Sequence, residues 1–496
     1  MKLPDRLRDP AFLLPSLLVA AALVLRLADV GGKSLWGDEF YAAGLMRSGF
    51  SQLLRASFQG SPHPPLAFLS LRLSSLLFGT SEAGLRVVPA LLTSFAVVPL
   101  FLFIRPRLGN FPAFLGGLLW AVSPYSVSLG QEVWLYGTLA FFGFTFIWLC
   151  DLAWKGNRPA AYLLVPVGLA GMLVQHLFFL FLASGFLLYF TVERGERAPL
   201  RKLLLLALLM LLVYAPFVFP ALEQAGLRSA RIRGAGMEGV IAYRLVRRVP
   251  TVIARLIPGG LASEMPRWNF SQPVTPAIFL VSGVCVLVPM VLLMFCRRLS
   301  ISQRLWTLGT FLLPLLLFFV EDPTARHLSI MWIPLALSIA ALAGTFRPGA
   351  IAVVGFAALL LLPYYRVDTF PYHRSDWRSA VSSVLDRREE DQQVVVLAGQ
   401  NGGLAWDYYA GEDTERLAPG GEDPYGVQAV TSDIDPLDTV DSVLGSGRET
   451  WVVHDIWGGP SGGDIAPRWP MLVHEKHGPH LEVMLFGTER SDGSLR

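Results

Sequence analysis

Charged side chains are scarce in this sequence. They make up 16% of its 496 residues, whereas hydrophobic residues make up 53%. A soluble domain usually carries about 25% charged residues, so the composition excludes an ordinary soluble globular protein. The class that it predicts is a polytopic α-helical membrane protein, in which long apolar helices cross the bilayer.

Cysteines are few, and nucleotide-binding motifs are absent. Cys150, Cys285 and Cys296 all lie in apolar segments, which excludes a disulfide framework in the polar parts of the chain. The sequence has no P-loop, no dinucleotide-binding fingerprint and no zinc-ligand spacing, so nothing in it predicts nucleotide hydrolysis. We expect no nucleic-acid partner either.

Apolar segments long enough to cross a membrane occur eleven times. They cover residues 11–29, 85–104, 112–128, 133–153, 159–173, 176–192, 201–221, 273–296, 303–320, 327–345 and 350–365. A further segment, Leu66 to Phe78, is too short for a span and contains Arg72. Its length indicates an interfacial or re-entrant helix.

Basic residues decide the predicted topology. With eleven spans, the short Lys- and Arg-rich loops all fall on the side of the N-terminus, which the positive-inside rule identifies as the cytoplasm. The outer face then receives the loop after the first span, the turns at Glu132 and Arg326, the 222–272 loop and everything after residue 365. Polar residues suited to chemistry therefore gather on the outer face.

Residues 366–496 differ in composition from residues 1–365. The first part has 30 basic and 15 acidic residues, and the last part has 11 basic and 23 acidic ones. Strand-like runs between Gly-, Pro- and Asp-rich loops are typical of a small α/β domain. These runs are 393–398, 450–453 and 481–486. We therefore predict a transmembrane catalytic domain over 1–365, with juxtamembrane helices in its 30–83 loop, and a soluble outer α/β domain over 366–496.

Two adjacent carboxylates, Asp38 and Glu39, follow the first span. Each disfavours ionisation of the other, and both resist leaving water, so the pair suits a general base better than a structural role. Apolar and basic residues from 40 to 58 predict interfacial helices that would hold Asp38 at headgroup depth. The alternative is that both acids only cap the first of these helices and favour its dipole.

Three more residues on the predicted outer face are candidates for substrate contact or catalysis. His63 starts the short helix, where prolines fit the first turn; the alternative for His63 is a purely structural role. Glu132 and Tyr136 lie between two consecutive spans. A carboxylate is costly to bury near a bilayer, and the alternative for Glu132 is a helix end exposed to water.

Arginines are concentrated in two outer segments. Those of the 222–272 loop are Arg228, Arg231, Arg233, Arg244, Arg247, Arg248, Arg255 and Arg267. Arg326, next to His327, lies in the turn before a later span. A guanidinium suits bidentate capture of phosphate, so these residues are candidate phosphate ligands. The alternatives are attraction of the loop to anionic lipids and pairing of Arg326 with Glu321 or Asp322.

An ordered set of these motifs resembles the GT-C membrane glycosyltransferases, in the bacterial branch related to protein O-mannosyltransferases and aminoarabinose lipid A transferases. The set comprises Trp36-Gly37-Asp38-Glu39, His63 to Leu66, Phe78-Gly79, Arg86 to Pro89, Ser123-Pro124, Gln131-Glu132 with Tyr136, and Asp376-Trp377-Arg378. Two positions depart from the family pattern: Trp134 stands where an arginine is expected, and His327 stands where relatives often have tyrosine.

The resemblance implies a bacterial inner-membrane enzyme that moves a sugar, with inversion, from a polyprenyl-phosphate donor to an acceptor on the outer face. Membrane lipids are the other expected partner, and the acceptor is unidentified. Catalytic roles fall to Asp38, as the base, Glu39 and Glu132, and substrate binding falls to His63, Tyr136, Arg326 and His327. This scheme requires no metal, although the three acids could bind a divalent cation.

The alternative function is a transporter or flippase of lipid-linked sugars. Transporters keep ionisable groups and broken helices near the midplane of the membrane. In this sequence the ionisable residues cluster at the predicted outer ends of spans, and Arg26, near such an end, is expected to extend to the interface. The pattern therefore favours an enzyme.

Overall fold

The described residues of the computed structural model form two compact units. Described are residues 9–59, 63–193, 195–201, 204–218, 244–258, 274–319, 323–365, 376–389, 392–397, 402–410, 427–429, 449–455, 471–477 and 481–487. We call residues 1–30, 49–79 and 84–367 the helical unit, and residues 31–48, 80–83 and 368–496 the sheet unit. The loop after the first span therefore packs largely with the last part of the chain.

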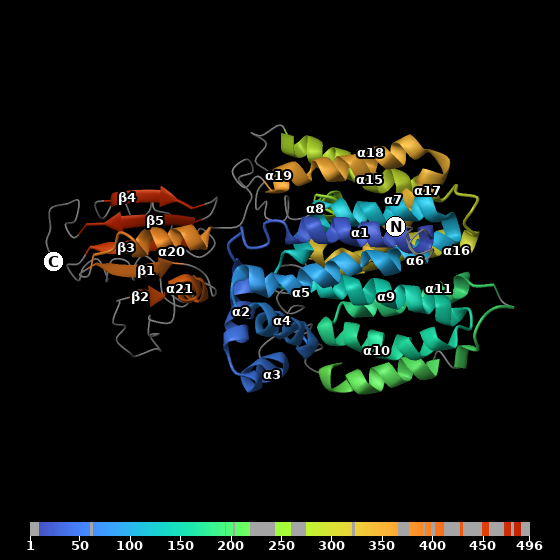
Figure 1. The fold of residues 1–496 in the computed structure, drawn as a ribbon, viewed down its shortest axis with the longest axis horizontal. Helices are drawn as coiled ribbons and strands as arrows, with labels where there is room; N and C mark the ends of the chain where they lie inside the picture. Colours follow the sequence, from blue (N-terminus) through green and yellow to red (C-terminus); the bar gives the residue numbers. More distant parts are fainter. Residues whose placement is uncertain are drawn as a thin grey trace, which may run out of the picture. The chain divides into compact units, whose positions relative to one another are not determined.

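The helical unit consists of helices that run mostly side by side (Figure 1). They are α1 (Pro10–Leu27), α3 (Phe50–Gln59), α4 (Pro65–Phe78), α5 (Glu82–Phe95), α6 (Val97–Leu108), α7 (Asn110–Val122), α8 (Pro124–Gly130), α9 (Tyr136–Trp154), α10 (Arg158–Val174), α11 (Phe178–Leu188), η2 (Tyr189–Thr191), a helix at Leu204–Val218, η3 (Arg244–Arg248), α14 (Val249–Ala254), α15 (Val274–Leu293), α16 (Ile301–Leu312), η5 (Leu313–Phe319), η6 (Ala325–Met331), α17 (Trp332–Thr345), α18 (Arg347–Leu359) and α19 (Leu361–Tyr365).

These helices confirm a multi-pass, mostly helical membrane protein. Six of the helices in the described part are long and apolar enough to cross a membrane, or seven if the bent pair α7 and α8 is one span. Four shorter apolar helices coincide with further predicted spans, namely 158–174, 178–191, 204–218 and 277–293. The total of eleven spans stays a prediction.

The segment after His63 forms the short helix that its length indicated. Pro65 occupies the first turn of α4, where a missing N–H costs nothing. Gly79 ends the helix with φ +85°, a conformation that glycine adopts readily. The helix has 14 residues, which gives a length of about 21 Å.

The centre of the helical unit depends on close packing between α7 and α17. A Cβ atom added to Gly116 in α7 would lie 2.7 Å from the carbonyl oxygen of Ala336 in α17. Only glycine therefore permits this approach of the two backbones. Beside this contact, Trp120 packs edge-on against Trp332 with ring centroids 5.2 Å apart, and both side chains are buried.

A 59° bend separates α7 from α8, and Arg26 stabilises it. Pro124 starts α8 after Ser123, whose hydroxyl accepts from the Ser126 N–H. The Arg26 guanidinium donates to the carbonyls of Ala121 (3.2 Å) and Trp120 (3.4 Å) at the end of α7. Our prediction that Arg26 extends to the interface is wrong: its side chain is 0% exposed, because the broken helix offers it carbonyl acceptors.

The sheet unit contains a five-stranded mixed sheet (Figure 1). Its elements are α2 (Gly37–Arg47), α20 (Trp377–Leu385), β1 (Gln393–Leu397), α21 (Gly402–Ala410), β2 (Val427–Ala429), β3 (Thr450–Asp455), β4 (Met471–Lys476) and β5 (Leu481–Phe486). The strand order is β2-β1-β3-β5-β4. β1 pairs in parallel with β2 and β3, and β5 runs antiparallel to β3 and β4.

Burial explains which of these strands the sequence predicts. β1, β3 and β5 lie inside the sheet and coincide with the three predicted runs, and all six residues of β5 are buried. β2 and β4 are edge strands, and the sequence analysis missed both. β4 starts with the apolar residues Met471 to Val473, but it continues with His474, Glu475 and Lys476 and is largely exposed, as an edge strand can be.

Candidate functional site

The acidic turn after the first span lies in the sheet unit, at the start of α2. The Trp36 N–H donates to the Glu39 carboxylate at 3.3 Å, and the Glu39 N–H donates to the Trp36 carbonyl at 2.7 Å. Glu39 therefore supplies the side-chain half of a capping box, whereas Trp36 contributes only its backbone carbonyl because its indole has no acceptor. Glu39 is 0% exposed, whereas Asp38 is half-buried. The capping alternative therefore describes Glu39, and it leaves Asp38 as the more accessible acid.

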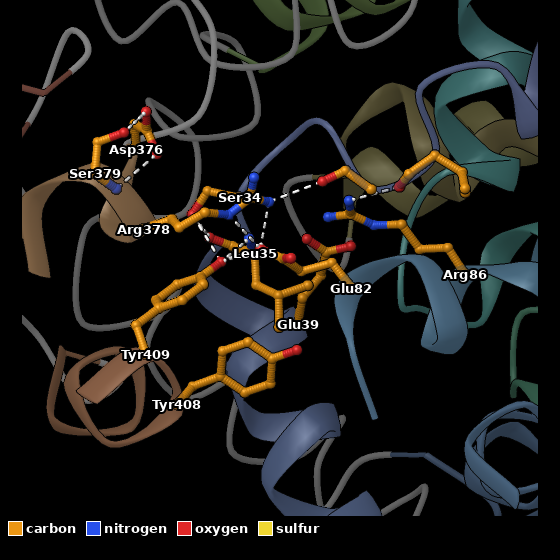
Figure 2. Close-up of polar contacts among 12 residues, drawn as sticks. Ser34, Leu35, Glu39, Glu82, Arg86, Asp376, Arg378, Ser379, Tyr408 and Tyr409 are labelled. Carbon is orange, nitrogen blue, oxygen red and sulfur yellow. Dashed lines mark hydrogen bonds and ion pairs between the residues drawn. The ribbon is translucent and has the colours of Figure 1, made fainter. Parts of the chain in front are cut away.

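Glu82 connects the segment before Asp38 to the helices α20 and α21 (Figure 2). Arg378 from α20 donates to the Glu82 carboxylate through Nη2 (2.6 Å) and Nε (3.1 Å), and the Tyr409 hydroxyl of α21 donates to the same oxygen at 2.7 Å. Arg378 also donates to the carbonyl of Gly31 at 2.8 Å. One carboxylate thus joins two helices that come from the C-terminal part of the chain.

The Tyr409 hydroxyl also binds the backbone just before the acidic turn. It accepts from the Leu35 N–H at 2.8 Å and shares a 3.0 Å hydrogen bond with the Ser34 hydroxyl. Burial raises the pKa of Tyr409, and its bond to Glu82 raises it further, against the opposing bonds from Ser34 and Leu35. The phenol therefore stays neutral at physiological pH and can donate to Glu82.

Further along α2, aromatic rings of α20 and α21 pack against Phe40. Phe40 meets Trp377, Tyr408 and Tyr409 edge-on, with centroids 6.0 to 6.2 Å apart. At the end of α2, the Arg47 guanidinium lies 4.3 Å from the centre of the Tyr408 ring. Both ends of α2 are thereby attached to α21.

In the helical unit, Glu132 lies in a buried turn between α8 and α9. Glu132 is 7% exposed, and its neighbours Gln131, Val133, Trp134 and Leu135 are buried as well. The alternative of a helix end exposed to water is therefore not what the structure shows. The Glu132 carboxylate interacts electrostatically with the buried Tyr125 hydroxyl.

Gln131 fixes this turn from three sides. Its amide nitrogen donates to the carbonyls of Ala28 (2.8 Å) and Arg26 (3.2 Å), and its amide oxygen accepts from the Tyr364 hydroxyl at 2.9 Å. The sequence analysis noted Gln131 only as part of a motif. Its three partners lie far away in the chain, so only the fold reveals this structural role.

Tyr136, Arg326 and His327 meet in one cluster. The Arg326 guanidinium lies 5.3 Å from the centre of the Tyr136 ring, and the His327 ring meets the same ring edge-on at 5.2 Å. The Thr324 N–H donates to His327 Nδ1 at 2.9 Å, so the neutral imidazole carries its proton on Nε2. Both Arg326 and His327 are half-buried, which suits groups that contact a ligand.

His63 contacts the aromatic side chain that replaces the arginine expected at position 134. Its ring lies edge-on to Trp134, with centroids 5.1 Å apart, and also near Phe68 at 6.4 Å. Trp134 is buried. The side chain at this position therefore supplies an aromatic surface instead of a charge.

Arg255 is buried, and the sequence analysis did not distinguish it from the other seven arginines of the 222–272 loop. It is 4% exposed, and among the described residues it has no carboxylate partner. Its guanidinium lies 5.9 Å from the Phe279 ring, and the nearby charge of Arg248 is repulsive. The Tyr125 N–H donates to the Ile257 carbonyl at 3.2 Å, which attaches this segment to the start of α8.

The predicted site residues thus fall into two sets. Asp38 and Glu39 lie in the sheet unit. The helical unit holds His63, Glu132, Tyr136, Arg326 and His327, which gather around the turn from 131 to 136 and η6. Six residues of the sequence analysis lie outside the described residues: Glu321, Asp322, Arg228, Arg231, Arg233 and Arg267. The predicted pairing of Arg326 with Glu321 or Asp322 therefore lies outside them as well.

A known family matches part of the chain. The profile of the dolichyl-phosphate-mannose-protein mannosyltransferases matches residues 62–219, which include His63, Glu132 and Tyr136. The structure of ArnT from Cupriavidus metallidurans bound to undecaprenyl phosphate superposes with a TM-score of 0.54, over 95% of this chain and 97% of that chain. Residues 62–219 therefore resemble a mannosyltransferase family, and the chain shares the fold of ArnT.

The other comparisons are more distant or negative. The apo structure of the same ArnT gives a TM-score of 0.53, and both ArnT structures are 13% identical to this chain in sequence. Archaeal oligosaccharyltransferase AglB from Archaeoglobus fulgidus, in complex with an inhibitory peptide and a dolichol-phosphate, is 14% identical with a TM-score of 0.45, over 78% of this chain and 62% of that chain. No curated protein sequence matches significantly.

Proposed function

We propose that this protein is an inverting glycosyltransferase that takes its sugar from a polyprenyl-phosphate donor and acts on the outer face of the bacterial inner membrane. The acceptor is a hydroxyl or phosphate group of a lipid, glycan or protein. The basic loops support this location, and the family match over residues 62–219 and the side chains described above support this activity.

The single observation that supports a donor with a phosphate group is the environment of Arg255. A buried guanidinium without an anionic partner is costly, and a phosphate would remove that cost through charge-assisted hydrogen bonds. Within the described residues of the helical unit, Arg326 and the Nε2–H of His327 are further donors of the right type. A lipid phosphate is the anion that a membrane protein meets at headgroup depth.

The proposed reaction is a single displacement. The Asp38 carboxylate takes the acceptor proton as the acceptor oxygen bonds to the anomeric carbon, and the bond from that carbon to the phosphate oxygen breaks with its electron pair. Proton transfer to Asp38 and attack on the anomeric carbon are concerted, because a carboxylate cannot ionise an alcohol beforehand. The products are the inverted glycoside and polyprenyl phosphate, whose developing charge the arginines stabilise.

The remaining candidates have supporting roles in this proposal. Glu132 accepts hydrogen bonds from hydroxyl groups of the donor sugar, and the rings of His63 and Tyr136 form part of the walls that contact it. Glu39 keeps α2 in place through its capping box. The reaction as written needs no metal.

The test is a transfer assay with the purified full-length protein in lipid nanodiscs. Radiolabelled polyprenyl-phosphate sugars are supplied with a bacterial envelope extract as acceptor source, and both the release of polyprenyl phosphate and the labelled product are measured. We expect transfer by the wild type, and transfer that is slower by about 10²- to 10⁴-fold by Asp38→Asn with equal expression. Equal transfer by both proteins would exclude Asp38 as the base.

The same donors distinguish the alternative function. In proteoliposomes, a flippase would move a fluorescent lipid-linked sugar between leaflets without cleaving it. We expect cleavage that depends on the acceptor. Translocation without any release of polyprenyl phosphate, for every donor tested, would overturn the proposed enzyme.

A further inference from the structure

We propose that the C-terminal part of the chain positions the acidic turn through Tyr409, and that Tyr409 is therefore a positioning residue for transfer. This inference rests on the proposed function, because it concerns the placement of the proposed base Asp38. It assigns a role in the reaction to α21, whose residues the proposed chemistry does not otherwise use.

The contacts of Tyr409 are directed at the backbone immediately before Asp38. Its hydroxyl oxygen accepts from the Leu35 N–H at 2.8 Å and bonds the Ser34 hydroxyl at 3.0 Å, and its proton goes to Glu82 at 2.7 Å. A phenolic oxygen has one proton and two lone pairs, so every bonding position of this hydroxyl is used (Figure 2). Leu35 is fully buried and Ser34 nearly so.

Glu82 keeps the Tyr409 hydroxyl in this orientation. Its carboxylate accepts from Tyr409 and twice from Arg378, whose Nη2 also donates to the Gly31 carbonyl. The segment from Gly31 to Leu35 is thus attached at its first residue and at its last two. Three residues later comes Asp38, so a shift of this segment moves the carboxylate.

Tyr409 is expected to affect the rate because proton transfer depends on the position of the Asp38 carboxylate. A base must lie within hydrogen-bond reach of the proton that it takes, and a displacement of about 1 Å can cost about 100-fold in rate. Tyr409→Phe removes three hydrogen bonds but keeps the ring that contacts Phe40 at 6.0 Å. The fold of the sheet unit is therefore preserved while the acidic turn loses its attachment.

The chain offers a matched control at the adjacent position. Tyr408 also contacts Phe40, at 6.1 Å, but its hydroxyl donates to the Thr80 carbonyl at 2.8 Å and not to the segment before Asp38. Tyr408→Phe removes one phenolic hydroxyl from the same helix. We expect Tyr409→Phe to lower kcat by about 10- to 100-fold with KM for the donor unchanged, and Tyr408→Phe to change kcat less than about twofold.

A combination with Asp38→Asn separates positioning from a merely structural role. If Tyr409 acts by placing the Asp38 carboxylate, Tyr409→Phe should not reduce the residual rate of Asp38→Asn any further. A further 10-fold loss in the double variant would overturn the proposal. So would an unchanged kcat in the single variant Tyr409→Phe.

Hydrogen exchange of the full-length protein provides a readout that does not depend on the reaction. The Leu35 amide loses its acceptor in Tyr409→Phe, so a peptide covering residues 31–40 should exchange faster than in the wild type or in Tyr408→Phe. Unchanged exchange would refute the attachment itself. Faster exchange, in a protein whose wild type shows no transfer, would instead refute the proposed function and with it the kinetic role of Tyr409.

Discussion

Two turns of this molecule each place a carboxylate at a helix start, and they do so in opposite ways. At the start of α2 in the sheet unit, Glu39 is buried as a cap and Asp38 stays half-buried. At the start of α9 in the helical unit, Glu132 is buried in a turn that Gln131 fixes. The comparison shows that each turn buries one acid, Glu39 or Glu132, and that only the first turn leaves a second acid, Asp38, accessible.

The largest expected effect distinguishes the two acids of the first turn. Asp38→Asn should lower kcat by about 10²- to 10⁴-fold, because it removes the base and preserves the shape. Glu39→Gln should retain most activity, since glutamine also satisfies a capping box. Transfer kinetics of both variants check this. A larger loss for Glu39→Gln than for Asp38→Asn would reverse the assigned roles.

Arginines give the next contrast, between Arg255 and Arg326, which lie within the described residues, and Arg228, which does not. Arg255→Ala and Arg326→Ala should each reduce transfer by about 10- to 100-fold, as expected for a lost charge-assisted hydrogen bond. The loss at Arg326 should appear mainly in kcat. Arg228→Ala should instead weaken donor binding slightly and change its salt dependence. Equal small effects from all three would remove Arg255 and Arg326 from the site.

The buried turn can be tested through stability. Gln131→Met removes three hydrogen bonds at nearly constant size and should lower the free energy of unfolding by about 1 to 3 kcal/mol. The exposed Gln52 accepts only from the Gly49 N–H, so Gln52→Met is the matched control and should have little effect. Thermal unfolding in detergent measures both. Equal midpoints for the two variants would contradict the structural role of Gln131.

The smallest expected effect on stability comes from an ion pair, and ion pairs again differ between the two units. In the helical unit the Arg107–Asp151 pair is buried, with side chains 6% and 3% exposed, whereas Arg387–Glu475 in the sheet unit is 38% and 39% exposed. The bonds from Arg387 and Ser383 lower the pKa of Glu475 below its usual 4.5. Its stabilisation is therefore present above pH 4.5 and lost as the pH falls through the lower folded-state value.

Because the Glu475 pair faces solvent, its contribution should stay below about 1 kcal/mol. The unfolding midpoints of wild type and Glu475→Gln, compared at pH 7 and pH 3, measure it. The difference between the two proteins should shrink at pH 3. A difference that is independent of pH would mean that Glu475 acts through packing and not through its charge.

Some of this molecule follows from the sequence alone. Long apolar runs require helices in a membrane, because each backbone polar group must be satisfied within its own segment. That requirement predicted the helical segments and the short α4, and buried runs predicted β1, β3 and β5. Ordered motifs indicated a glycosyltransferase family, and His63, Glu132 and Tyr136 lie within the region that the mannosyltransferase family profile matches.

Tertiary structure decided the burial and the hydrogen-bond partners of individual side chains. Arg26 is buried because the end of α7 offers it carbonyls, and Tyr409 reaches Leu35 from 374 residues away. The edge strands β2 and β4 each pair with one neighbour only, and the sequence analysis predicted neither of them. Local patterns report burial and helix length, whereas hydrogen bonds between distant segments form only when the chain is folded. Such bonds hold Leu35, Gln131 and Ile257 in this structure.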